Sequence, residues 1–414
     1  MTKLSSIADY VTDKISSNDI ALREYVTTDC ILQNKKGREI ATNLPPQSCC
    51  LTRYQHGDVL IANIRPYLKK VWFADIDGGA SSDVLVFRAK EGHSPSFLYA
   101  VLLQDSFFDY VMQGAKGSKM PRGDKEQILR YEMPTLSCSE ESIGTFFLNL
   151  DQKIRLNEQI NQNLEAMAKQ LYDYWFVQFD FPDENGRPYK SSGGEMVWNE
   201  KLKRKIPASW ENKNIEDIAD VYNGATPSTI NEQNYGGDIV WITPKDLSDQ
   251  KQKFVYQGER NISQAGYNSC STHLLPPNTI LMSSRAPIGL LSIAKTELCT
   301  NQGFKSFVPK AENISTYLYY YLNIHIKQIE QLGTGTTFKE VSREDVLKFP
   351  ILKPSDAILD LWEKQVSALN NKQFVIQKEN EFLTKQRDEL LPLLMNGQVS
   401  VNSDLAVSYI TILR

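Results

Sequence analysis

A glycine- and threonine-rich segment, GTGTTFKEVSREDVLKFPI, occupies residues 333–351. Glycine-rich loops that open a helix often bind phosphate groups, so nucleotide binding is the first hypothesis. The spacing argues against it. A Walker loop needs a lysine and a hydroxyl residue directly after its last glycine, and a dinucleotide fingerprint needs a third glycine and a preceding apolar strand. The segment has neither feature, so its composition requires another explanation.

Other catalytic patterns are missing from the sequence. It contains no Asn-Pro-Pro-aromatic motif for amino methylation and no helicase phosphate loop. The four histidines are scattered and the six cysteines have no CxxC spacing, so we expect neither a catalytic triad, nor a zinc site, nor a disulfide framework. Glu140 and Glu141 stand at a predicted helix start, where paired carboxylates favour capping over acid-base catalysis. We therefore predict no catalytic residue and no metal site in this chain.

Basic and hydroxyl side chains near two glycine loops could instead bind DNA. The second loop, GAKGSKMPRGDKEQILRYEMP, occupies residues 114–134. Hydroxyl groups and backbone amides suit phosphate and base contacts, and arginine is the residue that most often reads guanine. A net charge of -4 argues against a chain that coats nucleic acid indiscriminately, but it allows basic residues to gather on one face. The candidate DNA-binding residues are Arg65, Lys69, Lys70, Lys116, Ser118, Lys119, Arg122, Lys125, Thr226, Ser228, Lys245, Arg285, Thr334, Thr336, Thr337, Lys339 and Arg343.

An internal repeat organises the elements that must position these residues. Residues 57–90 resemble residues 278–310, in a register that pairs Arg65 with Arg285 and Phe87 with Phe307. The two glycine loops follow in the same order, each with a polar helix start and an apolar exit. Short alternating runs near residues 59–61, 71–73, 239–242 and 279–282 predict strands, and residues 96–112 and 315–332 predict helices. Each half is therefore predicted to be an α+β domain.

A long, charged, glycine-free segment follows each glycine loop, with apolar residues at heptad spacing. Such stripes predict long helices, each about 60 Å long for about 40 residues, that pack as an antiparallel coiled coil. Asn161 and Asn380 occupy the same repeat position, and we expect them to lie near each other where the helices cross. The alternative is that the leucines only dock each helix on its own globular half. The positions expected at this interface are Leu150, Ile154, Asn161, Leu164, Leu171, Leu369, Ile376, Asn380, Leu383 and Leu390.

These patterns predict two α+β domains, pseudo-symmetric to each other and separated by two long antiparallel coiled-coil helices. Two such domains held at a fixed distance could bind two sites on the same side of duplex DNA, whose helical repeat is about 34 Å per turn. We call such DNA-recognition domains readers. Because the halves differ in sequence, the two half-sites should differ too. The predicted boundaries are 1–137 for the first domain, 138–180 for the first helix, 181–210 for a linker, 211–354 for the second domain, 355–397 for the second helix and 398–414 for a tail.

The sequence resembles the specificity subunits of type I restriction-modification systems over nearly its whole length. The resemblance is carried by IPASWENKNIEDIADVYNGATPS, GGDIVWITPKDL, the glycine loop of residues 333–351 and the helix that ends in LLPLLMNGQVSV. It implies two target-recognition domains that each read half of a bipartite, asymmetric DNA site. It also implies two helices that act as a spacer and dock two methyltransferase subunits.

The resemblance further implies that this chain is not an enzyme by itself. S-adenosylmethionine would bind the methyltransferase partner, which would also flip the target base. ATP and magnesium would bind a restriction subunit, where one is present. The partners expected are double-stranded DNA and these subunits, with no membrane and a cytoplasmic location, because no apolar run could serve as a signal peptide or span a bilayer. Two other classes stay open at this point: a single-chain enzyme that reads and modifies DNA, and a coiled-coil adaptor without a DNA function.

Overall fold

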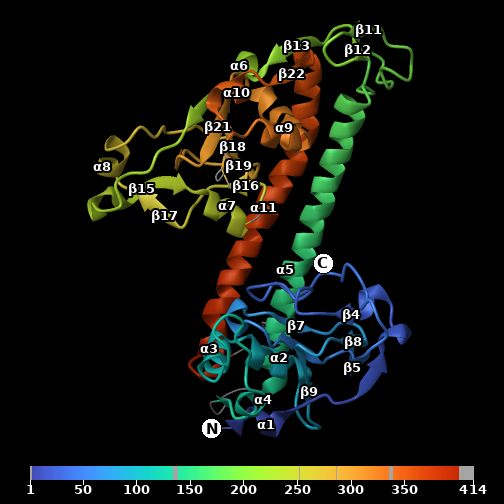
Figure 1. Ribbon diagram of the computed structural model, residues 1–414, viewed down its shortest axis with the longest axis vertical. Coiled ribbons are helices and arrows are strands. Elements are labelled where there is room, and N and C mark those ends of the chain that lie inside the picture. Colours follow the sequence, from blue (N-terminus) through green and yellow to red (C-terminus); the bar gives the residue numbers. More distant parts are fainter. Residues whose placement is uncertain (1, 134–138, 251, 286, 335–338, 401–414) are drawn as a thin grey trace. The chain divides into compact units, whose positions relative to one another are not determined.

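The computed structural model describes residues 2–133, 139–250, 252–285, 287–334 and 339–400 (Figure 1). The chain divides into two compact units, each with helices and sheets. Unit 1 comprises residues 1–159 and 378–414, and unit 2 comprises residues 160–377. The mixed α and β composition that the sequence predicts is confirmed.

Unit 1 is built on an antiparallel four-stranded sheet in which β6 (Val59–Ala62) is one of the two inner strands. Every residue of β6 is buried, and successive side chains point to opposite faces. Val59 and Ile61 belong to one hydrophobic cluster, whereas Leu60 belongs to another. The strand order is β2 (Ala8–Tyr10), β9 (Val84–Ala89), β6 and β7 (Val71–Phe73); the second sheet is β3 (Lys14–Ser16), β5 (Cys50–Tyr54), β8 (Gly78–Ala80) and β4 (Tyr25–Val26).

The remaining elements of unit 1 follow the order that the sequence predicts. A helical region divides at Gln104 into α2 (Pro95–Leu103) and α3 (Asp105–Gln113), where one helix was expected. Beyond the glycine loop, Asp124 caps the short helix α4 (Lys125–Ile128) through the backbone amides of Glu126 and Gln127. The apolar exit is β10 (Glu132–Met133), which pairs with β1 (Thr2–Lys3).

Unit 2 repeats this arrangement. In its main sheet, the strands β14, β21, β18 and β19 correspond in order to β2, β9, β6 and β7, which confirms the internal repeat. The main helix α9 (Ser315–Gln331) covers the positions predicted for it. The elements are β13 (Glu211–Asn214), α6 (Ile215–Ile218), β14 (Ala219–Asn223), β15 (Tyr235–Ile242), α7 (Pro244–Gln250), β16 (Phe254–Val255), β17 (Arg260–Ile262), α8 (Gln264–Asn268), β18 (Ile280–Ser283), β19 (Leu291–Ala294), β20 (Cys299–Thr300), β21 (Phe304–Pro309), α10 (Arg343–Leu347) and β22 (Pro350–Lys353).

Two long helices contribute to both units. They are α5 (Glu140–Tyr172), which continues into the π-helical turn η4 (Asp173–Val177), and α11 (Asp356–Met395). Within each unit they run antiparallel. In unit 1 the Asn380 side chain donates to the main-chain oxygen of Ile154 at 3.2 Å, and in unit 2 Asn161 donates to that of Gln373 at 3.3 Å. The two asparagines occupy the same repeat position, and so do the two acceptors, so the repeat extends to individual hydrogen bonds.

The heptad positions face inward. Leu150, Ile154, Leu164, Ile376 and Leu383 are buried. The remaining leucines of the ladders, Leu171, Leu369 and Leu390, are partly buried against the hydrophobic clusters. In unit 1, residues from both helices share one cluster with the sheet and α2, so the stripes serve domain docking as well as helix pairing.

The interface between α5 and α11 also contains polar groups at positions of the heptad ladder. Asn157 is buried and donates to Asn380 Oδ1 at 2.9 Å. The expected proximity of Asn161 to Asn380 stays a prediction, since each has a partner within its own unit.

The segment predicted as a linker, residues 181–210, is folded into unit 2. It forms the hairpin of β11 (Met196–Asn199) and β12 (Arg204–Pro207). Phe181 and Trp210 stack with their ring centroids 5.3 Å apart in the main hydrophobic cluster of unit 2. Aromatic burial therefore holds this segment, despite its glycine, proline and charge content.

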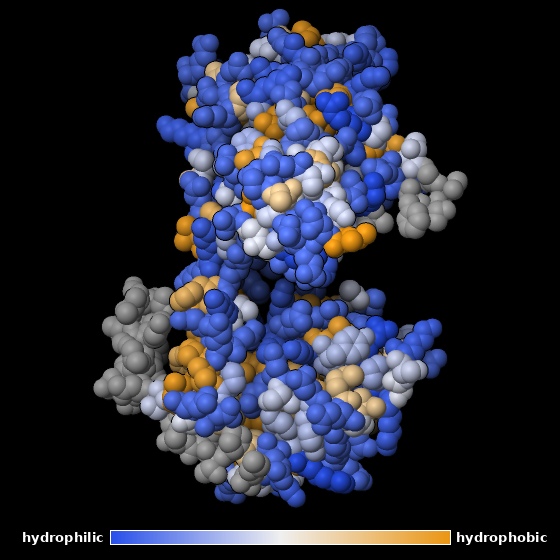
Figure 2. All heavy atoms as spheres, turned by 90° about the vertical axis from the view of Figure 1, so that its left-hand side faces the viewer, coloured by the Kyte–Doolittle hydropathy of each residue, from blue (hydrophilic) through white to orange (hydrophobic). Residues whose placement is uncertain are grey.

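The face shown in Figure 2 is mainly hydrophilic, with hydrophobic side chains in small scattered groups. Among the described residues, no helix combines the length and the apolar character that a membrane span requires. Within the same residues, no group of histidine, cysteine, aspartate and glutamate side chains is arranged to hold a metal ion.

Candidate nucleic-acid interface

Three loops of unit 2 leave its main sheet at one edge. Asn223 at the end of β14 pairs with Lys305, and Ser283 at the end of β18 pairs with Phe304. Residues 224–228 and residues 284–285 therefore leave the sheet at the same edge where residues 301–303 enter it, and we call this edge the loop edge of unit 2. This edge carries the predicted Thr226, Ser228 and Arg285.

The glycine loop of unit 2 joins the same edge. Thr334 and Glu340 exchange two backbone hydrogen bonds, of 3.1 and 3.0 Å, as the ends of a hairpin do. The amide of Val341 then donates to the main-chain oxygen of Ser284 at 3.1 Å, which ties the loop to β18. Residues 335–338, which include the predicted Thr336 and Thr337, lie outside the described part of the chain.

Unit 1 has an equivalent loop edge. Lys116 and Arg122 exchange two backbone hydrogen bonds of 2.9 Å, in the place that Thr334 and Glu340 hold in unit 2. The amide of Arg65 donates to the main-chain oxygen of Pro121 at 2.8 Å, so the structure brings Arg65 and this glycine loop together. Arg65 has a φ of 53°, a left-handed conformation that is uncommon for a residue with a Cβ and is often found at functional loops.

Several predicted cations of unit 1 are engaged with other groups. Lys69 forms an ion pair with Asp105 at 2.9 Å, and the Lys70 ammonium donates to a main-chain oxygen. Arg122 pairs with Asp83 at 3.1 Å. Lys116 pairs with Asp124 at 3.1 Å; the pKa of Asp124 is lowered by hydrogen bonds from the backbone of Gln127 and from Lys116. Binding of phosphate by these side chains would compete with their internal partners.

The predicted cations of unit 2 show the same pattern. Arg285 pairs with Glu340 at 3.1 Å, and Glu340 also binds the buried Lys305 at 3.2 Å. Lys245 pairs with Glu259 at 2.7 Å, and this hydrogen bond raises the pKa of Lys245. Arg343 at the start of α10 donates to the main-chain oxygen of Val221 in β14, so it links this helix to the main sheet. Glu340 was not anticipated, because nothing local in the sequence shows which basic residue an acidic one will meet.

Other predicted residues point into solvent. Among the described residues, Arg65, Ser118, Lys119, Lys125 and Lys339 are exposed and have no internal partner for their side chains. Four of the five are cationic. Three of these four cations, Arg65, Lys119 and Lys125, belong to unit 1 and one, Lys339, to unit 2, so among the predicted residues the unpaired positive charge is greater in unit 1.

The loop edge of unit 2 includes a residue that the sequence did not point to, Gln302. It lies exposed in the turn between β20 and β21. The hydroxyl of Thr226 donates to Gln302 Oε1. Trp241 donates from Nε1 to the main-chain oxygen of Ala225 at 3.2 Å and so fixes the residue before Thr226. Thr226 is therefore placed as a support for Gln302.

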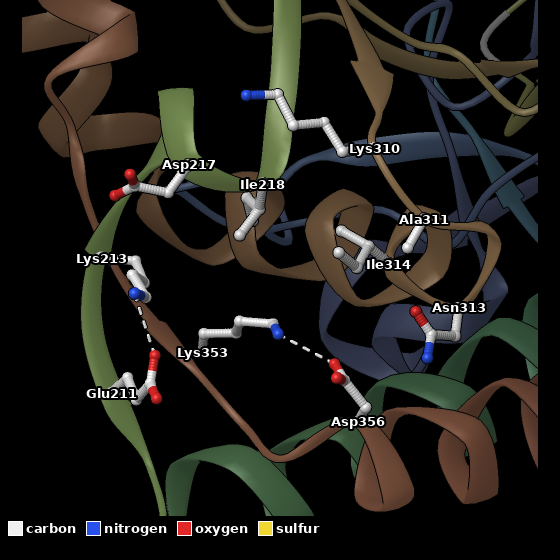
Figure 3. Close-up of a pocket in the computed structure, with 10 residues that line it drawn as sticks. All are labelled: Glu211, Lys213, Asp217, Ile218, Lys310, Ala311, Asn313, Ile314, Lys353 and Asp356. Atoms are coloured by element: carbon white, nitrogen blue, oxygen red, sulfur yellow. Dashed lines mark hydrogen bonds and ion pairs between the residues drawn. The ribbon is translucent and has the colours of Figure 1, made fainter.

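A pocket of about 570 Å³ lies elsewhere in unit 2 (Figure 3). It is near Lys310, which follows the end of β21 opposite to the loop edge. Its cations have acidic partners: Lys213 pairs with Glu211 at 3.0 Å and Lys353 with Asp356 at 2.8 Å. A pocket with its charges internally balanced offers little to an anionic ligand, and none of the predicted DNA-binding residues lines it.

The comparisons with known proteins agree with one another. Residues 207–381 match the family model of the type I restriction modification DNA specificity domain. The type I restriction enzyme MjaIX specificity subunit of Methanocaldococcus jannaschii is 38% identical over 192 residues, which are 45% of this chain and 44% of that protein. The HindI specificity subunit of Haemophilus influenzae is 28% identical over 439 residues, covering 91% of this chain and 94% of that protein.

Among solved structures, the S subunit of a type I restriction-modification system from M. genitalium has the same fold. Its TM-score is 0.60 at 13% identity, over 97% of this chain and 96% of that one. The family match assigns residues 207–381 to the type I restriction modification DNA specificity domain, and the solved structure supports the fold of the chain. Over most of its length this chain is similar to the specificity subunits of type I restriction enzymes.

Proposed function

We propose that this chain selects the DNA site for a type I restriction-modification complex, with unit 1 recognising one half of a bipartite, asymmetric site and unit 2 the other half. The observation that supports this most directly is the repeated loop edge. Arg65 and Arg285 occupy the same repeat position. In each unit, a backbone hydrogen bond joins the glycine loop to the segment that carries this arginine. Two such edges in one chain give two readers of similar architecture.

The two edges differ in chemistry, which supports two unlike half-sites. The glycine loop of unit 1 begins and ends with Lys116 and Arg122, whereas that of unit 2 begins and ends with Thr334 and Glu340. A basic loop is suited mainly to phosphates, and a loop of hydroxyl and amide groups is suited more to base edges. Unit 1 would then contribute more of the salt-dependent affinity.

The helices α5 and α11 would set the spacing between the half-sites and dock two methyltransferase subunits. Leu156 on α5 and Val375 on α11 occupy the same repeat position, and their exposed fractions are 53% and 65%. An exposed apolar residue at the same position of each repeat is consistent with two copies of one partner, one bound at Leu156 and the other at Val375. S-adenosylmethionine would be bound by that partner, and ATP with magnesium by a restriction subunit where the complex includes one.

Methylation mapping tests the proposal. DNA from a host that expresses this chain with its neighbouring methyltransferase would be compared, by single-molecule sequencing, with DNA from a host that lacks the chain. The expected result is one gained motif with two unlike specified halves around an unspecified gap. A continuous motif would contradict the two-reader arrangement. No gained motif from a complex shown to be assembled and soluble would contradict the function and favour the adaptor alternative.

The alternative of a single-chain enzyme that reads and modifies DNA can be tested by cofactor binding, because such an enzyme would itself bind S-adenosylmethionine. The purified chain, without a methyltransferase, would be titrated with S-adenosylmethionine in a calorimeter, with the assembled complex as the positive control. Binding by the isolated chain would favour that alternative. We expect binding by the complex alone.

A further inference from the structure

The main chain around Gln302 is held rigid on both sides. The amide of Asn301 donates to the oxygen of Ile242 at 3.0 Å, and the Asn301 side chain accepts from the amide of Gly303 at 2.9 Å. The amide of Phe304 closes the turn on the oxygen of Asn301 at 3.3 Å. These backbone hydrogen bonds fix the position of the Gln302 Cα atom, although the side chain itself is exposed.

The side chain of Gln302 is oriented as well. The Thr226 hydroxyl donates to Gln302 Oε1 across 76 positions of sequence. Gly224 makes this contact possible, because a Cβ at that position would overlap main-chain oxygens of the turn that contains Gln302. With the Trp241 indole fixing the same segment, the hydroxyl is held in place independently of any ligand.

The hydrogen-bonding groups left to Gln302 define what it could bind. Its amide nitrogen carries two donors, and its oxygen keeps one lone pair beyond the bond from Thr226. A donor beside an acceptor matches N7 and the N6 amino group of adenine in the major groove, the contact that glutamine and asparagine make with that base. Arg285 on the same edge is paired with Glu340 through Nε at 3.1 Å, so a contact of Arg285 with a guanine beside the adenine would compete with this ion pair.

We propose that Gln302 is a base-reading residue of unit 2, that it selects an adenine, and that Thr226 positions it. The inference rests on the proposed function, since it names one specificity determinant of that interface. In the register that pairs Phe87 with Phe307, the corresponding residue of unit 1 is Ser82, which is exposed and has no amide. The proposal therefore confines the effect of Gln302 to one half of the bipartite site.

The test uses the chain in its complex with the methyltransferase subunits. Methylation would be mapped in hosts that carry the wild type, Gln302→Ala, Gln302→Glu, Thr226→Val and, as a matched control, Gln178→Ala, which changes an exposed glutamine at the end of η4. Each purified complex would also be titrated with duplexes in which every specified base pair is changed in turn, and its melting temperature would be measured.

We expect the wild-type motif to contain an adenine, in the half-site assigned to unit 2, whose discrimination Gln302→Ala lowers by about ten- to a hundred-fold. Gln302→Glu should shift the preference at that position toward cytosine, because a carboxylate accepts from the cytosine amino group. Thr226→Val should relax the same position to a smaller degree. The other half-site and the Gln178→Ala motif should not change.

Three outcomes would overturn the proposal. One is an unchanged motif for both Gln302 variants. Another is relaxation at positions in both half-sites. The third is a folded Gln302→Ala complex, with unaltered melting temperature, that binds all duplexes uniformly more weakly. These results differ from failure of the proposed function, in which the wild type itself produces no bipartite motif.

Discussion

Arg387 provides a sharp test of how the helices are joined to unit 1. Its side chain is 4% exposed and lies 3.0 Å from Asp151 on α5 and 3.0 Å from Asp388. Asp151, itself 7% exposed, also accepts from the hydroxyl of Tyr99 in α2. Burial by itself lowers the pKa of Arg387, but the charges of Asp151 and Asp388 outweigh it, and the pKa is raised.

Arg387→Ala should therefore destabilise unit 1 strongly. The substitution leaves the buried Asp151 carboxylate without its counter-charge, which costs about 3–5 kcal/mol. This cost corresponds to a loss of protection from hydrogen exchange of roughly 140- to 4000-fold, at about 1.4 kcal/mol per tenfold. The double variant Asp151→Leu with Arg387→Met should recover most of the stability, because replacing both charges by apolar groups of similar size removes the unpaired charge.

Hydrogen exchange measured by mass spectrometry can separate the two units. The slowest-exchanging amides of β6 would report the stability of unit 1. Those of β18 would report the stability of unit 2, which serves as the internal reference. Lys385→Ala, on the same helix, is the matched control because Lys385 is 71% exposed and its ion pair with Glu389 at 3.8 Å should contribute little. A loss of protection below about fivefold for Arg387→Ala, or a double variant no more stable than the single one, would refute the reasoning.

The remaining predictions concern partners, pH and recognition. Leu156→Asp and Val375→Asp should each reduce the number of bound methyltransferase subunits from two to one in native mass spectra, since each places a charge on one of the two proposed docking sites; retention of both subunits would contradict that assignment. Burial lowers the pKa of His325, so folded unit 2 binds fewer protons than the unfolded chain and loses stability as the pH falls below 6.5. Thermal melts of His325→Gln should show a smaller loss over that range, and an unchanged slope would point to other groups. Gly224→Ala should relax the half-site of unit 2 in methylation maps while that of unit 1 persists, because the added Cβ overlaps the turn that carries the base-reading glutamine.

The local patterns of the sequence determined the elements and their order. Alternating apolar runs gave β6 and β18 at the predicted positions, and heptad spacing gave the buried faces of α5 and α11. The repeat predicted matching sheets in both units, and the sheet order confirms it. These features follow from the sequence because side-chain periodicity and turn residues act over a few neighbouring positions.

The tertiary structure alone decided which polar groups meet. Lys253 lies within hydrogen-bonding distance of Glu165, Tyr320 and Asn370, at 2.7, 2.6 and 2.8 Å, in the interior of unit 2, although they are far apart in the chain. Arg285 meets Glu340, and Thr226 meets Gln302, for the same reason. A charge or an amide has many possible partners of suitable chemistry, and only the folded backbone fixes which one is within reach. The sequence therefore predicted the order of the elements in the two repeated units, whereas the fold determined which polar side chains at their loop edges have internal partners.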